Sequence, residues 1–228
     1  MSAVELDAVT VRLGESAALE DVTLHLDAPR IAVIGENGSG KSTFGRVAAG
    51  LVPVSGGRVR VLGLDPIRQS AALRPRVAMD FSNPDAQIVM PTVAEDVAFS
   101  LRPARLPAAE VRTRVAAALE EFGLAHLAER SAHELSGGQK QLLALCGAFI
   151  RRPELVIADE PTAALDARNS RRVSDHLFAD TGHRLMIATH DLALAERCDV
   201  AVLFAAGRVE GVGRPSDVIA EYEAMLRC

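Results

Sequence analysis

A glycine-rich segment near the N-terminus carries the residue types that hold phosphate groups. It follows the pattern G-x-x-x-x-G-K-[ST] and consists of Gly35, Glu36, Asn37, Gly38, Ser39, Gly40, Lys41, Ser42 and Thr43. Glycines let the backbone turn its N–H groups onto phosphate oxygens, and a helix that begins here adds its positive end. In this pattern Lys41 reaches the β- and γ-phosphates, and the Ser42 hydroxyl ligates Mg²⁺. Because an apolar run at 30–34 precedes the segment and a helical pattern follows, the sequence predicts a phosphate loop rather than an ordinary turn.

Two adjacent carboxylates follow a second apolar run, at 155–158. Asp159 is suited to holding Mg²⁺, usually through water. Glu160 is then placed to orient the attacking water and take its proton. An acidic pair at a strand end is by itself as easily explained by exposure to solvent. Together with the phosphate loop, it predicts a site of phosphate hydrolysis.

A third segment opens a helix that the sequence predicts over 136–150. It consists of Leu135, Ser136, Gly137, Gly138 and Gln139. Ser136 and Gln139 have the spacing of a capping box, in which each side chain binds the other residue's backbone N–H. A helix start of this kind also offers oriented N–H groups to an anion, so the structural and functional interpretations are compatible.

The order of these segments resembles the ATP-binding-cassette (ABC) ATPases over nearly the whole chain. The loop at 35–43 comes first, then the segment at 135–139, the carboxylates at 159–160, and finally Thr189-His190-Asp191. The resemblance implies that the cofactors are ATP and Mg²⁺ and that Lys41, Glu160 and His190 are catalytic, with His190 contacting the γ-phosphate. We call 135–139 the signature segment from here on.

The resemblance also implies a site shared between two chains. In this family the signature segment binds the γ-phosphate held on another subunit's phosphate loop, and the segment Ala163-Ala164-Leu165-Asp166 crosses the interface. Two cassettes then lie head to tail with two ATP molecules between them. A homodimer is expected because this chain carries the motifs of both half-sites, and a heterodimer is the alternative.

The hydrophobic pattern predicts the elements that must position these residues. It indicates strands at 9–13, 22–26, 30–34, 58–62, 155–158, 185–188, 200–204 and 208–212, and helices at 42–51, 107–122, 136–150 and 166–181. The fold expected is an α/β P-loop NTPase with a mostly parallel core sheet, an N-terminal antiparallel β-subdomain and an inserted helical subdomain. We expect one ATP-binding domain over 1–228, with its core in 1–84 and 151–228 and its helical subdomain, carrying the signature segment, at about 85–150.

Composition excludes several other classes of protein. The chain has 228 residues and a net charge of −5, which argues against a protein that coats nucleic acid. Its three cysteines lie far apart without a CxxC pair, so neither a disulfide framework nor a zinc site is expected. No apolar run approaches the roughly 18 residues of a membrane span, and the N-terminus lacks the pattern of a signal peptide. The expected location is therefore the cytoplasm.

Two residues depart from the family pattern. Leu13 stands where the family usually has an aromatic residue that stacks on adenine, so apolar contact with the base is expected instead. Ser82 stands where related cassettes usually have a glutamine that senses Mg²⁺ and water, and its shorter side chain is expected to reach the metal only through a water. Gln87 is interpreted as part of a partner contact rather than as this sensor.

The segment at 83–99 resembles the corresponding part of the ATPases of energy-coupling-factor (ECF) importers of vitamins and metal ions. The resemblance implies that it contacts a transmembrane coupling subunit, which works with a substrate-binding membrane subunit, so the chain would be peripheral on the inner face of the membrane. Its apolar residues are Ile88, Val89, Met90 and Val93, for which burial in the core beneath a loop is the alternative. The sequence after the signature segment, 139–145, is most similar to that of biotin-transporter ATPases, with cobalt and nickel ATPases next.

Two other functions remain open from the sequence. One is an ABC switch that clamps a soluble partner without transport, which the 83–99 segment disfavours. The other is a degenerate cassette that binds ATP but hydrolyses it weakly, which Leu13 and Ser82 leave possible and the intact Lys41, Asp159 and Glu160 disfavour.

Overall fold

The computed structural model describes residues 2–14, 16–163 and 165–227, which group into two compact units. The core unit contains 2–79, 154–160 and 182–227, and the helical unit contains 80–153 and 161–181. Each unit is described by itself. The division of one domain into subdomains at 84 and 150 stays a prediction.

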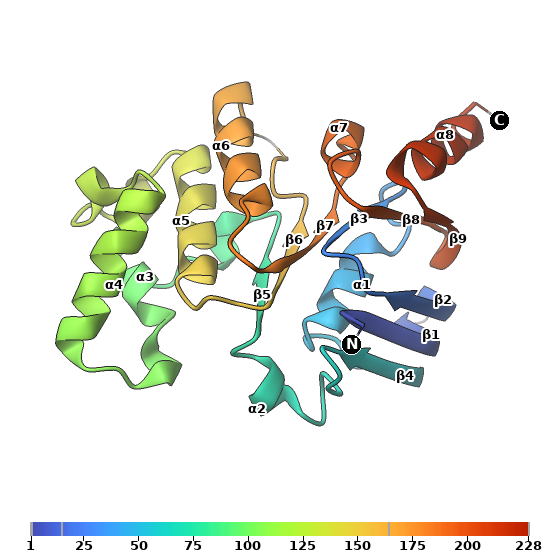
Figure 1. Ribbon diagram of the computed structural model, residues 1–228, viewed down its shortest axis with the longest axis horizontal. Helices are drawn as coiled ribbons and strands as arrows, with labels where there is room; N and C mark the ends of the chain where they lie inside the picture. The colour runs from blue at the N-terminus through green and yellow to red at the C-terminus, as the bar shows by residue number, and fades with distance from the viewer. Residues whose placement is uncertain (1, 15, 164, 228) are drawn as a thin grey trace. The chain divides into compact units, whose positions relative to one another are not determined.

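A six-stranded sheet is the framework of the core unit (Figure 1). Its order is β5-β6-β7-β3-β8-β9, formed by β3 (Arg30–Ile34), β5 (Val77–Asp80), β6 (Leu155–Asp159), β7 (Arg184–Ala188), β8 (Val200–Ala205) and β9 (Arg208–Gly213). Strand β3 pairs in parallel with β7 and β8, and β7 pairs in parallel with β6, so the segments that follow β3 and β6 leave the sheet at the same edge. Strand β9 returns antiparallel to β8, which confirms the predicted hairpin.

A three-stranded antiparallel sheet forms the second layer of the core unit. It has the order β2-β1-β4 and contains β1 (Val4–Leu13), β2 (Ser16–Leu26) and β4 (Gly56–Val61). Helix α1 (Lys41–Ala48) contacts strands of both sheets. Its buried Phe44 stacks on Phe204 of β8 with ring centroids 5.4 Å apart. The start of α1 is thus fixed by a continuous apolar core. The described residues of this unit also form the short helices α2 (Ser70–Leu73) and α7 (Leu192–Ala195) and the longer helix α8 (Pro215–Met225).

Four helices dominate the helical unit. They are α3 (Val93–Phe99), α4 (Ala108–Glu121), α5 (Gly137–Phe149) and α6 (Ala167–Phe178), joined in part by the 3₁₀ turns Pro84–Ala86, Arg102–Ala104, Ala125–Leu127 and Ala132–Glu134. Helix α3 packs against α4 and α5, and α5 packs against α6. The predicted end of α4 at Gly123 is confirmed, since this glycine has φ +66°.

Two helices are shorter than the sequence predicts. Helix α6 ends at Phe178 because Ala179 takes an extended conformation, with φ −58° and ψ 140°. Helix α1 ends at Ala48, and the following Gly50 has φ +72°. The α/β P-loop fold with a mostly parallel sheet, an antiparallel sheet and helices is confirmed. Within the described ranges, no helix combines the length and apolar character needed to cross a membrane.

Candidate functional site

The phosphate loop joins β3 to α1 in a conformation that depends on its glycines. Gly35 has φ +139° and Gly40 has φ +112°, and residues other than glycine rarely adopt such values. A Cβ on Gly35 would collide with the carbonyl oxygen of Phe204, and a Cβ on Gly40 would lie 2.9 Å from the carbonyl oxygen of Ala18. The loop is therefore pressed against β8 on one side and β2 on the other, and its shape is fixed by close packing.

Lys41 folds back over this loop. Its Nζ donates to the carbonyl oxygens of Gly35, at 2.7 Å, and Glu36, at 2.8 Å. Burial lowers the pKa of Lys41, while the nearby carboxylates of Glu160 and Asp159 oppose that shift. The ammonium group thus lies over the loop at the place where the sequence analysis puts the β- and γ-phosphates.

The predicted metal ligands Ser42 and Asp159 meet at the ends of α1 and β6. The Ser42 hydroxyl donates to Oδ1 of Asp159 at 2.8 Å, across 117 residues of sequence. A hydroxyl and a carboxylate are oxygen donors of the kind that Mg²⁺ prefers, and Mg²⁺ normally takes its other ligands from water and substrate phosphates. Among the described residues, no group of three or more His, Cys, Asp or Glu is placed to hold a metal ion.

Glu160 and His190 are in direct contact. Oε2 of Glu160 lies 2.7 Å from Nδ1 of His190 and 3.3 Å from the backbone N of His190, which donates to it. Glu160 itself has φ +52°, a rare conformation for a residue with a side chain, and its N–H donates to the carbonyl oxygen of Ala188. Such strain is concentrated at functional sites. With a proton on Nδ1 the ring donates to the carboxylate, and Nε2 stays available to another group.

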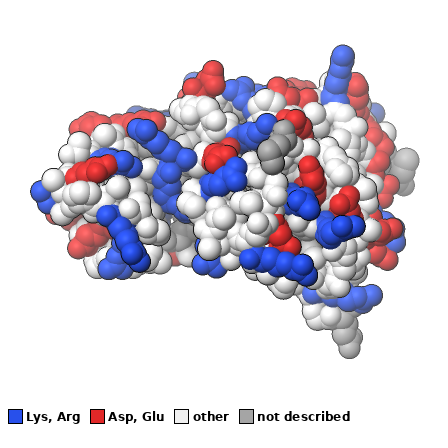
Figure 2. Space-filling model, turned by 60° about the horizontal axis from the view of Figure 1, so that its bottom comes forward, with Lys and Arg blue, Asp and Glu red and all other residues white. Residues whose placement is uncertain are grey.

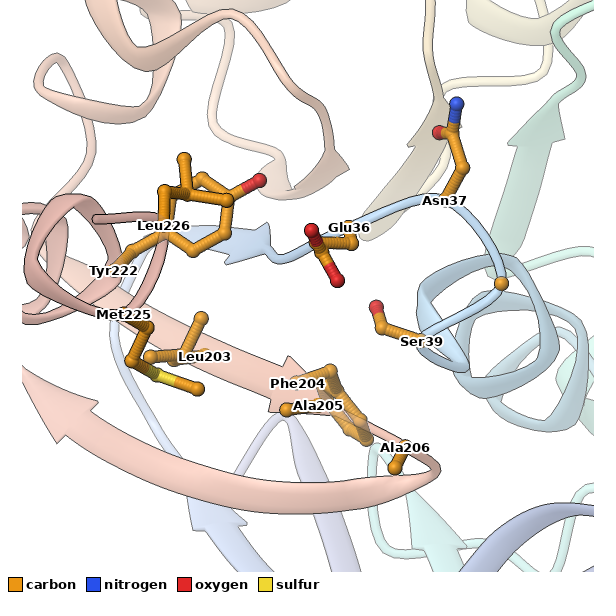
Figure 3. A pocket seen from close by; sticks show the side chains of 11 residues that line it. Glu36, Asn37, Ser39, Leu203, Phe204, Ala205, Ala206, Tyr222, Met225 and Leu226 are labelled. Carbon is orange, nitrogen blue, oxygen red and sulfur yellow. The ribbon is translucent and has the colours of Figure 1, made fainter. Parts of the chain in front are cut away.

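A hollow of about 320 Å³ adjoins the phosphate loop (Figure 3). Glu36, Asn37 and Ser39 line one side, and side chains from the end of α8 line the other, including Tyr222 and Leu226. Burial and the charge of Glu36 raise the pKa of Tyr222. Sequence reasoning missed these α8 residues as neighbours of the loop, because nothing in their local pattern links them to a segment nearly 190 residues earlier.

In the helical unit, the signature segment has the predicted capping box. The backbone N–H of Ser136 donates to Oε1 of Gln139 at 2.9 Å, and the N–H of Gln139 donates to Oγ of Ser136 at 3.4 Å. Gly138 packs so closely on Asn169 that an added Cβ would lie 2.9 Å from the Asn169 Cβ and closer still to its amide. Asp166 holds this asparagine by accepting from its backbone N at 2.8 Å and its Nδ2 at 2.9 Å.

The bond from the backbone N–H of Asn169 makes Asp166 the N-cap of α6, and it is also the main cause that lowers the Asp166 pKa. Sequence reasoning missed Asn169, although an asparagine three residues after a capping aspartate could have indicated this contact. Of the segment 163–166, Ala164 lies outside the described residues.

The remaining predicted site residues are on the surface. Leu13, at the end of β1, is 51% exposed, so a large apolar side chain is available for contact with a ligand. Ser82 is exposed in the helical unit just after β5, and its role toward Mg²⁺ stays a prediction.

The predicted partner segment, 83–99, is partly exposed and partly anchored. Val89 is 58% exposed, whereas Ile88 and Val93 are buried, so for these two the alternative of core packing is the one observed. A groove of about 540 Å³ is formed by Met90, by residues of α3 and α4 and by the turn that joins the two helices. Its lining includes Phe99, Leu101, Arg102, Arg105, Leu106, Val111 and Arg112. On the face of the molecule in Figure 2, basic and acidic side chains are interspersed.

Comparison with known proteins agrees with this geometry. A family model described as ABC transporter matches residues 19–163. The chain is 38% identical to the biotin transport ATP-binding protein BioM of Rhizobium etli, over 96% of this chain and 97% of that protein. It is 44% identical to the energy-coupling factor transporter ATP-binding protein EcfA1 of Symbiobacterium thermophilum, over 85% of this chain and 69% of that protein. Among solved structures, cbiO1 of Clostridium perfringens, part of the transporter complex cbiONQ, superposes with a TM-score of 0.85 and 30% identity, over 99% of this chain and 94% of that one.

Proposed function

The chain belongs to the family of ABC transporter ATPases, and from that premise we propose that it is the Mg²⁺-dependent ATP-hydrolysing subunit of an ECF-type importer. The observation that carries the hydrolytic part is the 2.7 Å contact between Glu160 and His190 beside the phosphate loop. A degenerate cassette has no need to hold a strained glutamate against a histidine at this place.

The residues of the core unit have distinct roles in the proposed reaction. The loop N–H groups and Lys41 bind the phosphates, and Ser42 and Asp159 hold Mg²⁺, which neutralises phosphate charge when it is bound. Glu160 takes a proton from the attacking water as the new oxygen–phosphorus bond forms and the bond to the β-phosphate oxygen breaks. His190 keeps the Glu160 carboxylate in place through its 2.7 Å contact.

We further propose that the reaction takes place in a site shared by two copies of this chain. The signature segment supplies the second half of the site, because its capped helix start leaves oriented N–H groups for the γ-phosphate. ATP then acts as the link between the copies, and its hydrolysis releases them, which couples chemistry to movement. A homodimer is supported because one chain carries both halves.

The proposed partners are a transmembrane coupling subunit and a substrate-binding membrane subunit, and the proposed location is the cytoplasmic face of the membrane. The exposed Val89 and the groove that starts at Met90 support docking through 83–99. Similarity over almost the full length of BioM makes biotin the first substrate to test. Cobalt and nickel follow, because the sequence at 139–145 is next most similar to that of cobalt and nickel ATPases.

The test is ATP hydrolysis by the purified chain as a function of its concentration, with Glu160→Gln beside it. We expect the rate per chain to rise with concentration and the variant to lose about 10²–10⁴ in rate, as is usual when a positioned base is removed. We also expect Glu160→Gln to form a stable dimer in ATP but not in ADP, measured by light scattering. A rate per chain that does not depend on concentration would exclude the shared site.

A further inference from the structure

A buried carboxylate in the helical unit joins the partner segment to the signature helix. Asp80, at the end of β5, is completely buried. Its Oδ2 accepts from Nε2 of Gln141 at 2.7 Å, and its Oδ1 accepts from Nε2 of Gln87 at 3.4 Å. Gln141 lies in the first turns of α5, two residues after the signature segment, and Gln87 lies in the segment predicted to meet the membrane partner.

A second, independent bond joins the same two parts. Nζ of Lys140, also on α5, lies 2.7 Å from Oδ1 of Asp85. The far end of the segment is fixed as well, because the buried Asp96 accepts from the backbone N–H groups of Val89, at 2.8 Å, and Met90, at 3.0 Å. The backbone at 85–90 is therefore held at both of its ends. Lys140, near the start of the signature helix, holds Asp85, and Asp96 holds Val89 and Met90.

The chemistry at Asp80 indicates that position, rather than stability, is what this residue provides. Removing a carboxylate from water is costly, and its hydrogen bonds return that cost only when the geometry is good. An apolar residue would fill the end of a strand such as Val77–Asp80 without that cost. The Asp80 carboxylate instead accepts from amides on two different segments, Gln87 and Gln141, and so fixes the position of each segment relative to the other. Apolar packing, which has no preferred direction, does not do this.

We propose that Asp80 is a positioning residue which, with the Lys140–Asp85 pair, makes the segment 83–92 and the start of the signature helix move as one piece. Docking of a partner on the exposed part of that segment then sets the position of the N–H groups that meet the γ-phosphate. This inference rests on the proposed function for its meaning, but the mechanical link itself is measurable without a partner or a nucleotide.

The first experiment is amide hydrogen exchange on the full chain with Asp80→Leu. Leucine has nearly the shape of aspartate but accepts no hydrogen bond, so both glutamine bonds are lost. We expect exchange to rise about tenfold or more in both 83–92 and 135–141, with strand β6 in the core unit unchanged. Arg114→Ala is the matched control, since it breaks an exposed ion pair to Glu110 on α4 of the same unit and should leave both segments unchanged.

A charge exchange tests the second bond with a rescue. Lys140→Glu alone should raise exchange in both segments, and Lys140→Glu combined with Asp85→Lys should restore it, because this pair is partly exposed and can be reversed. If exchange rises in only one segment, or in neither, the inference is overturned. If the double variant does not restore protection from exchange, the Lys140–Asp85 pair does not help to join the two segments.

Enzyme kinetics separate positioning from a general loss of structure. Asp80→Leu should lower kcat of ATP hydrolysis at saturating ATP about tenfold while the Kd for nucleotide on the phosphate loop stays within about twofold. Equal losses in both would contradict a positioning role. A wild-type chain without ATPase activity would overturn the proposed function instead, and the exchange result would still decide whether the two segments are joined.

Discussion

The contact between Gly138 and Asn169 gives the sharpest prediction about the signature segment, tested by Gly138→Ala. The new Cβ would lie 2.9 Å from the Cβ of Asn169 and closer still to its amide group. Asn169 cannot move aside freely, because Asp166 accepts two hydrogen bonds from it. Gly137→Ala is the matched control, since a Cβ at Gly137 meets nothing within 4 Å among the described residues.

The two variants differ only in that contact. Replacing glycine by alanine in a helix ordinarily stabilises it, by about 0.5–1 kcal/mol, and this gain is shared by both variants and cancels. Overpacking costs about 1–3 kcal/mol. A hydrogen bond lost when Asn169 shifts costs about 1 kcal/mol more. We therefore expect the free energy of unfolding of Gly138→Ala to be about 2–4 kcal/mol below that of Gly137→Ala.

Urea unfolding followed by circular dichroism measures this difference. With a typical slope, the midpoint of Gly138→Ala should lie about 1 M urea below that of Gly137→Ala. When both glycine variants also carry Asn169→Gly, most of the difference between them should disappear, because both the amide and the Cβ that the new methyl meets are then absent. Equal midpoints for the two glycine variants, or an undiminished difference with Asn169→Gly, would refute the reasoning.

Three further predictions concern the core unit. Lys41→Ala should weaken nucleotide binding by about 1.5–3 kcal/mol, because a charged donor is lost, and a fluorescent-nucleotide titration with unchanged affinity would contradict this. Gly35→Ala should destabilise the chain by about 3 kcal/mol or more, since its Cβ would collide with the Phe204 carbonyl in a backbone with φ +139°; a wild-type melting temperature would count against it. Above about pH 9 the free energy of unfolding should fall by about 1.4 kcal/mol per pH unit for each buried thiol, because burial raises the pKa of Cys146 and Cys198 from 9.0 to about 12, and only the unfolded chain releases their protons there. A Cys146→Ala, Cys198→Ala double variant should show a flatter pH profile, and an equally steep one would disprove the assignment.

Local patterns predicted the parts of the fold that local forces determine. The residues 31–34 are apolar and are followed by a glycine, and β3 covers them together with Arg30. The spacing of Ser136 and Gln139 predicted a capping box because such a box is made within four residues, and both of its hydrogen bonds are present. The sequence patterns assigned Ser42 and Asp159 each to Mg²⁺, which stays a prediction, and the structure brings the two side chains into contact.

The parts that sequence reasoning missed depend on contacts between distant segments. Asn169 touches Gly138 only because α5 and α6 pack together. Tyr222 lines the hollow beside Glu36 because the chain returns through β8 and α8. Asp80 is recognisable in the sequence as an acidic residue at the end of the strand Val77–Asp80. Its two glutamine partners could not be identified from the sequence, because one of them meets Asp80 only through the packing of α5.

Because lysine is scarce in this chain, chemical modification of lysine side chains reports on two functionally placed positions. Its two lysines are Lys41 and Lys140, against 23 arginines. One lies over the phosphate loop and the other anchors the helix that follows the signature segment. Amine-selective reagents that spare arginine will therefore label these two sites and the amino terminus. The side chain of Lys140 is 16% exposed in its ion pair, and Lys41 is buried, so their rates of modification will report loss of the Asp85 contact and occupancy of the loop separately, on the unaltered protein.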